Sequence, residues 1–276
     1  MDYRKELIVK PDTQVRLDRI DSRFAQVSLD NQEIDARIEK NRARMADQQL
    51  RIHAESRHSV LIVLQGLDAA GKDSVVKHIL SAMNPMSCTV TSFKVPTYEE
   101  AAHDFLWRHH NRAPARGWVS IFNRSHYEAV LVERVHKLVP KKVWSKRYEM
   151  INGFEKLLHR NHTSVVKLFL HISKEEQLRR FKDRLDDPDK RWKISEDDYT
   201  ERAFWDDYMK AYEDALSKTS TSRAPWYVVP SDRKRVRNLL ASEIIADTLG
   251  ELKISRPKPT VDIEMIRKKY HEAQES

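Results

Sequence analysis

Residues 60–73 read VLIVLQGLDAAGKD, and this stretch decides how the chain folds. The run VLIVLQ is short and rich in β-branched residues, which is typical of a strand buried on both faces. The next residues, GLDAAGKD, fit the pattern G-x-x-x-x-G-K, and a helix is expected from Lys72 to Ala82. A strand, this loop and a helix, in that order, are the context in which the pattern binds phosphate. A fortuitous match in a surface turn is disfavoured, because the 276 residues include only five glycines and two of them stand in this loop.

The loop predicts a cradle for a phosphate group. Backbone N–H groups would point inward, and the start of the helix adds a partial positive charge. Lys72 brings a full charge to the phosphoryl group. Asp73 stands where a Ser or Thr usually holds Mg²⁺, so another oxygen must take that place, and Asp68 is the obvious carboxylate. The residues expected to contact phosphates are Gly66, Ala69, Ala70, Gly71 and Asp73, with Lys77 further along the helix.

The rest of the chain alternates short apolar runs with helical patterns. This alternation predicts βαβ units and a parallel sheet with helices on both faces, a doubly wound α/β domain. Strands are expected at 60–65, 89–93, 118–122, 165–172 and 226–229, and helices at about 31–57, 72–82, 97–111, 125–138, 141–160, 174–186, 196–217 and 232–249. We expect an N-terminal extension with a helix packed on the core at 1–58, a single domain at 59–250 and a C-terminal tail at 251–276.

Composition limits the function classes. Lys and Arg number 50 against 42 Asp and Glu, a formal net charge of +8, which favours a polyanionic partner such as nucleotide phosphates, nucleic acid or a polymer of phosphate. The single cysteine, Cys88, excludes an intrachain disulfide and a multi-cysteine metal site. No apolar run approaches the ~20 residues of a membrane span, and the first residues do not resemble a secretory signal. The expected location is the cytoplasm, with no membrane partner.

A polar cluster, NRSHYE at 123–128, follows the strand expected at 118–122. Ligands of open α/β sheets bind outside the carboxyl ends of the strands, so this cluster and the phosphate loop should face each other. Arg124 can clamp a phosphate, and Asn123 can ligate a metal directly or through water. Ser125 and Glu128 also have the spacing of a capping box, so Glu128 has two readings, a helix cap and a functional carboxylate.

A third motif, DPDKRWKIS at 187–195, lies between two helical patterns. A charged segment of this kind can close over phosphates as a lid, exclude water and deliver cations. We expect the lid at about 180–200, whereas Trp192 is expected to be a core anchor. The expected lid cations are Arg180, Arg184, Lys190, Arg191 and Lys193.

Together these motifs resemble the polyphosphate kinase 2 family. The segments that carry the resemblance, over about residues 30–250, are GLDAAGKD at 66–73, SFKVPT at 92–97, HDFLWR at 103–108, FNRSHYE at 122–128 and DPDKRWKIS at 187–195. The resemblance implies a P-loop kinase-like fold of three α/β/α layers, similar to thymidylate kinase, with strands in the order 2-3-1-4-5. It implies phosphoryl transfer between inorganic polyphosphate and a nucleotide, dependent on Mg²⁺, with Mn²⁺ as an alternative ion. Family members commonly form homodimers or homotetramers.

The resemblance also implies residue roles. Asp68 matches the loop aspartate that holds magnesium, and Lys72 matches the phosphate lysine. The remaining matches are the second-motif pair Asn123 and Arg124, the lid cations Lys190, Arg191 and Lys193, and Glu128 and Lys94 on the acceptor side.

Two positions depart from the common family pattern. Many members carry Asp where this chain has Asn123, and some carry Asn where it has Glu128. The combination resembles the subgroup that phosphorylates both nucleoside mono- and diphosphates, such as AMP and ADP or their guanine equivalents.

Two rival functions remain open. An ATP-dependent nucleotide kinase on the same fold would ignore polyphosphate as a donor. A basic P-loop protein without enzymatic activity would bind nucleotide or nucleic acid alone. Nucleic acid is not the expected partner, because the chain has no helix-turn-helix, RNA-binding or zinc signature.

Overall fold

The buried strand expected at 60–65 is β1, Ser59–Gly66, and all its residues are buried. It lies at the centre of a five-stranded parallel sheet in the order β2-β3-β1-β4-β5, the order that the family resemblance implies. The computed structural model describes residues 3–275. The other strands are β2 Cys88–Ser92, β3 Val119–Asn123, β4 Thr163–His171 and β5 Trp226–Pro230, each within two residues of its expected bounds. The predicted fold class is confirmed.

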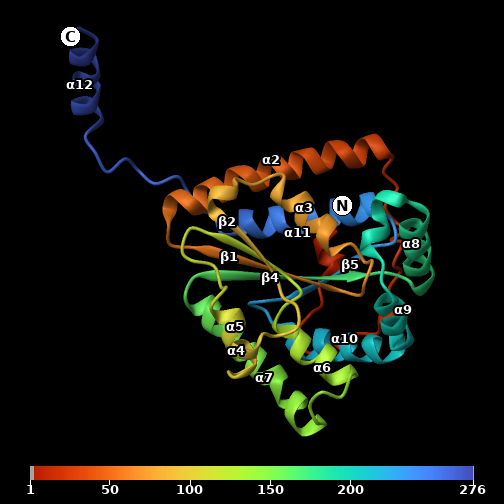
Figure 1. The fold of residues 1–276 in the computed structure, drawn as a ribbon. Helices are drawn as coiled ribbons and strands as arrows, with labels where there is room; N and C mark the ends of the chain where they lie inside the picture. Colours follow the sequence, from red (N-terminus) through yellow and green to blue (C-terminus); the bar gives the residue numbers. More distant parts are fainter. Residues whose placement is uncertain (1–2, 276) are drawn as a thin grey trace.

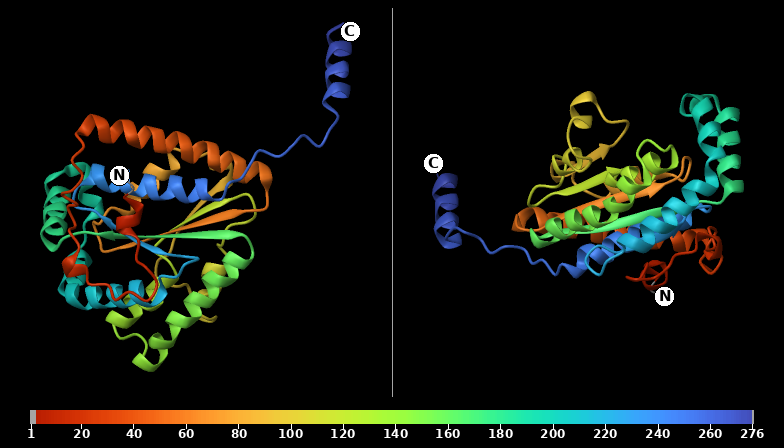
Figure 2. Two further views of the ribbon diagram at one scale, coloured as in Figure 1. Left: turned by 180° about the vertical axis from the view of Figure 1, so that it is seen from behind. Right: turned by 90° about the horizontal axis from the view of Figure 1, so that it is seen from below.

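Helices cover both faces of this sheet (Figure 1). One apolar core lies between the sheet and α2 (Asn31–Glu55), α3 (Lys72–Leu80) and α11 (Lys234–Glu251). A second core lies on the opposite face, against α7 (Lys141–Arg160) and α10 (Trp205–Thr219). The helices α8 (Lys174–Asp186) and α9 (Glu196–Ala203) stand beyond the carboxyl end of β4, as Figures 1 and 2 show.

The long helices agree with the sequence pattern, but three expected helices are interrupted. The expected helix at 97–111 is two short pieces, α4 (Tyr98–Ala101) and α5 (Trp107–His110), because the side chain of Asp104 accepts the N–H of Leu106 in a turn between them. The stretch 125–138 is a 3₁₀ turn, η3 (His126–Ala129), followed by α6 (Val132–Val135). The stretch 196–217 breaks at Phe204, whose ψ of 15° separates α9 from α10.

The N-terminal extension packs on the domain in two places. A short helix, α1 (Arg4–Leu7), precedes an antiparallel bridge between Ile8 and Tyr227 at the edge strand β5. The helix α2 then lies along α11 (Figure 1). At the other end of the chain, α12 (Ile263–Glu275) stands apart from the domain (Figure 2). Three further 3₁₀ turns are η1 Leu17–Arg19, η2 Pro85–Ser87 and η4 Pro188–Lys193. No helix in the described part of the chain is long and apolar enough to cross a membrane.

A buried ion pair between Lys167 of β4 and Glu155 of α7 joins three other polar groups in the core. Lys167 Nζ, fully buried on β4, donates to Glu155 Oε2 at 2.6 Å, Tyr127 Oη at 2.9 Å and the Thr219 carbonyl at 2.7 Å. The Tyr127 hydroxyl donates to Glu155 Oε1 at 2.8 Å, and His126 Nε2 lies 3.3 Å from the same oxygen. His126 and Tyr127 belong to the second motif, so this network fixes the position of the chain after β3.

Lys167→Met tests the network. It leaves the Glu155 carboxyl buried without its cation, so we expect the melting temperature to fall by roughly 10 °C, since breaking a buried pair costs about 3–5 kcal/mol. Circular dichroism during heating measures this change. Adding Glu155→Leu to Lys167→Met removes the stranded charge and should restore more than half of the loss. A single variant as stable as the parent chain would contradict the role given to the pair.

Candidate active site

The register of the sheet brings the phosphate loop and the second motif together. Leu64 of β1 is paired with Asn123 of β3, and the N–H of Arg124 donates to the Leu64 carbonyl at 3.1 Å. Arg124 has a φ of 61°, a left-handed conformation that is uncommon for a residue with a Cβ. This turn ends the strand beside the loop that follows β1.

The loop between β1 and α3 depends on its two glycines. At Gly66, with φ 155°, a Cβ would lie 2.9 Å from the Leu170 carbonyl oxygen of β4. At Gly71, with φ 103°, it would lie 1.9 Å from Nη1 of Arg237. Between them, Ala69 has φ 60° and the N–H of Ala70 donates to the Leu67 carbonyl at 3.1 Å. The chain then enters α3, whose first N–H groups have no partners inside the helix.

Lys72 is buried at the start of α3. Its Nζ donates to the Gly66 carbonyl at 2.7 Å and to the Leu67 carbonyl at 3.2 Å, and it lies 4.0 Å from Asp68 Oδ1. Burial lowers the pKa of Lys72, and the Asp68 carboxylate opposes this shift. The ammonium group is therefore held against the loop where the sequence places the phosphoryl group.

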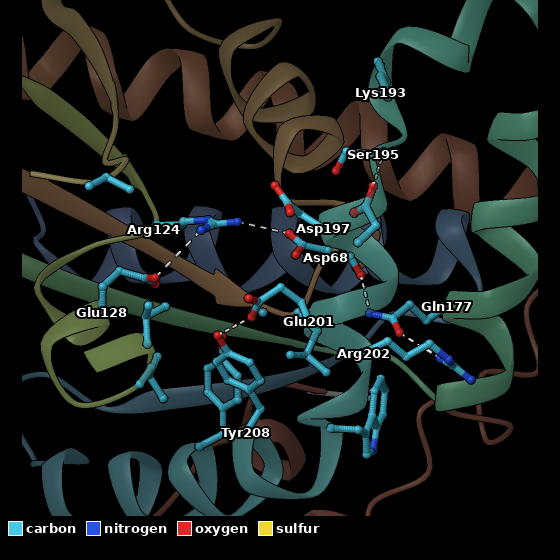
Figure 3. A pocket seen from close by; sticks show the side chains of 18 residues that line it. Asp68, Arg124, Glu128, Gln177, Lys193, Ser195, Asp197, Glu201, Arg202 and Tyr208 are labelled. Atoms are coloured by element: carbon cyan, nitrogen blue, oxygen red, sulfur yellow. Dashed lines mark hydrogen bonds and ion pairs between the residues drawn. The ribbon is translucent and has the colours of Figure 1, made fainter. Parts of the chain in front are cut away.

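Arg124 joins two carboxylates across the site (Figure 3). Its Nη2 donates to Asp68 Oδ1 at 3.1 Å, and its Nη1 lies 3.9 Å from Glu128 Oε2. Burial lowers the pKa of the Arg124 guanidinium, but the carboxylates of Glu128 and Asp68 raise it, and the pKa is raised overall. Burial raises the pKa of Glu128, and Arg124 opposes that shift. Asp68, Lys72, Arg124 and Glu128 therefore form one cluster, as the sequence analysis expected.

The capping-box reading of Glu128 is wrong. Ser125 does cap the turn, because its Oγ accepts the N–H of Tyr127 at 3.3 Å. The Glu128 side chain instead lines a hollow and faces Arg124. The functional reading of this carboxylate is supported by its position and stays a prediction.

The hollow beside this cluster, here called the first pocket, has a volume of about 450 Å³ (Figure 3). Apolar and aromatic side chains of α6 and α10 form one wall, and the lid segment and α9 form another. Five carboxylate side chains and three cationic side chains also line this pocket. The lining residues are Gly66, Leu67, Asp68, Val95, Arg124, Glu128, Leu131, Val132, Gln177, Lys193, Ser195, Asp197, Asp198, Glu201, Arg202, Trp205, Tyr208 and Tyr212.

A second pocket of about 500 Å³ opens between α3 and β2. Asn123 and Asp73 line it together, and Asn123 Nδ2 donates to Asp73 Oδ1 at 2.7 Å. Lys77 is exposed on its rim. Asn123 and Arg124, although adjacent in sequence, thus line different pockets on either side of the phosphate loop.

Asp68 and Asn123 are the two residues that the sequence analysis assigned to magnesium. Asp68 has a side chain that is 33% exposed, and Asn123 Oδ1 is buried without a hydrogen-bond partner within residues 3–275. In the same range no three His, Cys, Asp or Glu side chains form a cluster that could hold a metal ion. Mg²⁺ commonly takes one or two protein oxygens and fills its shell with water and substrate phosphates. The unpaired Asn123 oxygen and the accessible Asp68 carboxylate fit such an ion.

The expected lid cations have different surroundings. Lys193 lines the first pocket. Lys190 pairs with Asp187, Arg191 Nε donates to the Leu185 carbonyl at 2.9 Å, and Arg184 Nη1 donates to the Lys193 carbonyl at 3.1 Å. These three cations are thus bonded inside the segment and do not line the first pocket.

Two residues differ from their expected surroundings. Trp192 is 78% exposed, so the expectation of a core anchor is wrong; its ring contacts the Lys193 ammonium instead. Arg180 is buried, and it donates to the carbonyls of Ala69 and Ala70 at 2.8 and 3.2 Å, behind the phosphate loop. Lys94 is exposed, next to Val95 of the first pocket.

Several residues at the site were missed. Trp205, Tyr208 and Tyr212 share one face of α10, and their spacing of three and four residues was available in the sequence. Gln177 donates to the Asp68 carbonyl at 3.0 Å, and Arg237 lies against Gly71; neither carries a local signal in the sequence.

Comparisons with known proteins agree with these motifs. The family model described as Polyphosphate kinase 2 (PPK2) matches residues 28–257. The ADP-polyphosphate phosphotransferase of Rhodopseudomonas palustris is 48% identical over 229 residues, 79% of this chain and 79% of that protein. The AMP/ADP-polyphosphate phosphotransferase of Meiothermus ruber is 48% identical over 215 residues, 78% of this chain and 80% of that protein.

A solved structure gives the same result for the fold. The crystal structure of polyphosphate kinase 2 from Arthrobacter aurescens TC1 aligns with a TM-score of 0.94 at 40% identity, over 97% of this chain and 96% of that chain. The family and the enzyme class expected from the sequence are confirmed: this chain is a phosphotransferase that belongs to the polyphosphate kinase 2 family.

Proposed function

We propose that this enzyme transfers phosphoryl groups between inorganic polyphosphate and both nucleoside mono- and diphosphates, with Mg²⁺ bound. The observation that carries the proposal is the position of Lys72 and Arg124, beside a phosphate loop with a pocket on each side. A donor and an acceptor can then meet at the loop from opposite directions. The names of the relatives, which include AMP and ADP, support the choice of acceptors.

The lining of the first pocket favours the nucleotide there. Its three aromatic side chains, Trp205, Tyr208 and Tyr212, offer an apolar wall for a nucleoside. Its carboxylates would repel a long polyanion, because Asp68, Glu128, Asp197, Asp198 and Glu201 outnumber the cations Arg124, Lys193 and Arg202. We assign the polymer to the other side of the loop, where Lys77 is exposed.

The chemistry assigned to the chain is positioning and charge neutralisation. Phosphoryl transfer needs the two reacting oxygens in line, and the protein gains most by holding them so. Lys72 and Arg124 would contact the oxygens of the transferred group, with Glu128 holding the Arg124 fork. The acceptor is already a phosphate oxygen anion, so no strong general base is required.

Asp68 and Asn123 are the residues assigned to Mg²⁺, with Mn²⁺ as the alternative ion. When bound, the ion supplies positive charge that neutralises the phosphates. The Asp68 carboxylate also accepts a hydrogen bond from Arg124. This bond keeps the carboxylate oriented toward the first pocket.

The test of the proposal is an assay without ATP. The purified protein is incubated with long-chain polyphosphate, Mg²⁺ and either AMP or ADP, and nucleotides are separated by chromatography. ADP and ATP formed from AMP support both acceptors. ATP formed from ADP alone would contradict the subgroup assigned from Asn123 and Glu128. Activity that appears only when ATP is the donor would place the chain among the nucleotide kinases.

Lys72→Ala removes the buried ammonium from the loop. We expect kcat to fall at least about 100-fold, because one preorganised charge at a transition state contributes that much or more. Lys146→Ala, on the exposed face of α7, is the matched control and should keep full activity. Circular dichroism checks that both variants fold. Activity of Lys72→Ala close to that of the control would contradict the site.

Arg124→Lys tests the fork that joins Asp68 to Glu128. Lysine keeps the positive charge, but its ammonium group cannot contact both carboxylates as the planar guanidinium does. We therefore expect kcat to fall about 10- to 100-fold. Initial rates at saturating polyphosphate and nucleotide measure this effect. A loss seen only in KM would mean that Arg124 binds the ground state and does not act on the transferred group.

Assembly is a further prediction. We expect a homodimer or homotetramer, which light scattering on the purified protein measures. A monomer of about 33 kDa at working concentration would contradict it.

A further inference from the structure

Two arginines from distant parts of the chain meet behind the phosphate loop. Arg180 of α8 and Arg237 of α11 both donate to the Ala70 carbonyl, at 3.2 and 3.3 Å. The Ala70 carbonyl therefore points away from the side of the loop where the phosphate is assigned. Since the N–H and C=O of a trans peptide point in opposite directions, the N–H of Gly71 is turned toward the phosphate side.

The two arginines differ in their counter-charge. Arg180 forms an ion pair with Glu176 at 2.7 Å. Arg237 is 1% exposed, and its other donors reach only neutral atoms, Ser74 Oγ and Asn238 Oδ1, both at 2.9 Å. No carboxylate lies within 4.0 Å of its guanidinium in the part of the chain that the structure describes. Burial, and then the charge of Arg180, lower the pKa of Arg237 to about 10.

A buried cation without an anion is destabilising, so its presence needs a compensating group. The guanidinium lies directly against the loop, because a Cβ on Gly71 would be 1.9 Å from its Nη1. An anion bound in the phosphate cradle, on the other side of Gly71, would thus come close to this cation. The Lys72 ammonium and the start of α3 add positive potential at the same point.

We propose that Arg237 is a positioning residue whose buried charge is compensated by the phosphate held in the 66–71 loop, so that the bound anion stabilises the fold through this residue. The inference rests on the proposed function only in placing a phosphate in that loop. It predicts that Arg237 couples the affinity for phosphate to the stability of the domain. A purely structural Arg237 would stabilise the chain equally with and without the anion.

The experiment compares Arg237→Met with Arg237→Lys and with Arg235→Met, an exposed arginine on the same helix. Each protein is heated with and without inorganic tripolyphosphate in metal-free buffer, and the melting temperature is recorded. We expect tripolyphosphate to raise the melting temperature of the parent chain and of Arg235→Met. Without the anion, the melting temperature of Arg237→Met should equal or exceed that of the parent chain. With tripolyphosphate, the melting temperature of this variant should rise by less than half as much as that of the parent chain. Arg237→Lys keeps the positive charge, so it should retain most of the rise in melting temperature.

Steady-state kinetics give an independent readout. We expect KM for polyphosphate to increase about 5- to 150-fold in Arg237→Met, the usual range of coupling between sites, and much less in Arg237→Lys. The inference is overturned if Arg237→Met is destabilised and keeps the full rise, or if both variants fail to fold with and without the anion. If tripolyphosphate does not raise the melting temperature of the parent chain and the parent chain transfers no phosphoryl group, the result contradicts the proposed function and not only the role of Arg237.

Discussion

The path of the chain from Gly66 to Lys72 is the constraint on which the site depends. β4 closes one side of it, where the Leu170 carbonyl leaves no room for a Cβ at Gly66. Arg180 and Arg237 close the back, where their guanidinium groups donate hydrogen bonds to the Ala69 and Ala70 carbonyls of the loop. With the Ala69 and Ala70 carbonyls held behind, the loop can present N–H groups in front, beside the Lys72 ammonium. A phosphate cradle thus results from packing two buried cations against a strand–helix turn.

The opposite wall of the site is fixed by a different set of contacts. The Lys167 network holds His126 and Tyr127 in the core, separated by one residue from Asn123 and Arg124, which line the pockets. Asn123 and Arg124 therefore leave β3 in a defined direction, and the positive φ of Arg124 turns its guanidinium toward Asp68. A buried ion pair of this kind adds little net stability against an apolar core, but it specifies one arrangement of the chain. Here that arrangement positions the second motif.

The sequence predicted the strands and the loop well because their signals are local. A run such as residues 60–65 is apolar throughout, and only a central parallel strand buries both of its faces. Short elements were predicted less well, because single contacts decide them, as Asp104 does between α4 and α5. Arg237 could not have been found, since a basic run on a helix indicates a solvated face and its loop partner lies 167 residues away.

The lid segment combines exposed charge with few ties to the core. The side chains of Lys190 and Arg191 are bonded within residues 185–191, and Arg184 holds the backbone of Lys193. Trp192 is exposed, so it adds no apolar contact that would hold the segment in place. These bonds are internal to residues 184–193, whereas an ion pair of Arg184 with Asp198, at 3.6 Å, joins the segment to α9. The lid closure that we propose would bring Lys193, which already lines the first pocket, toward the phosphates.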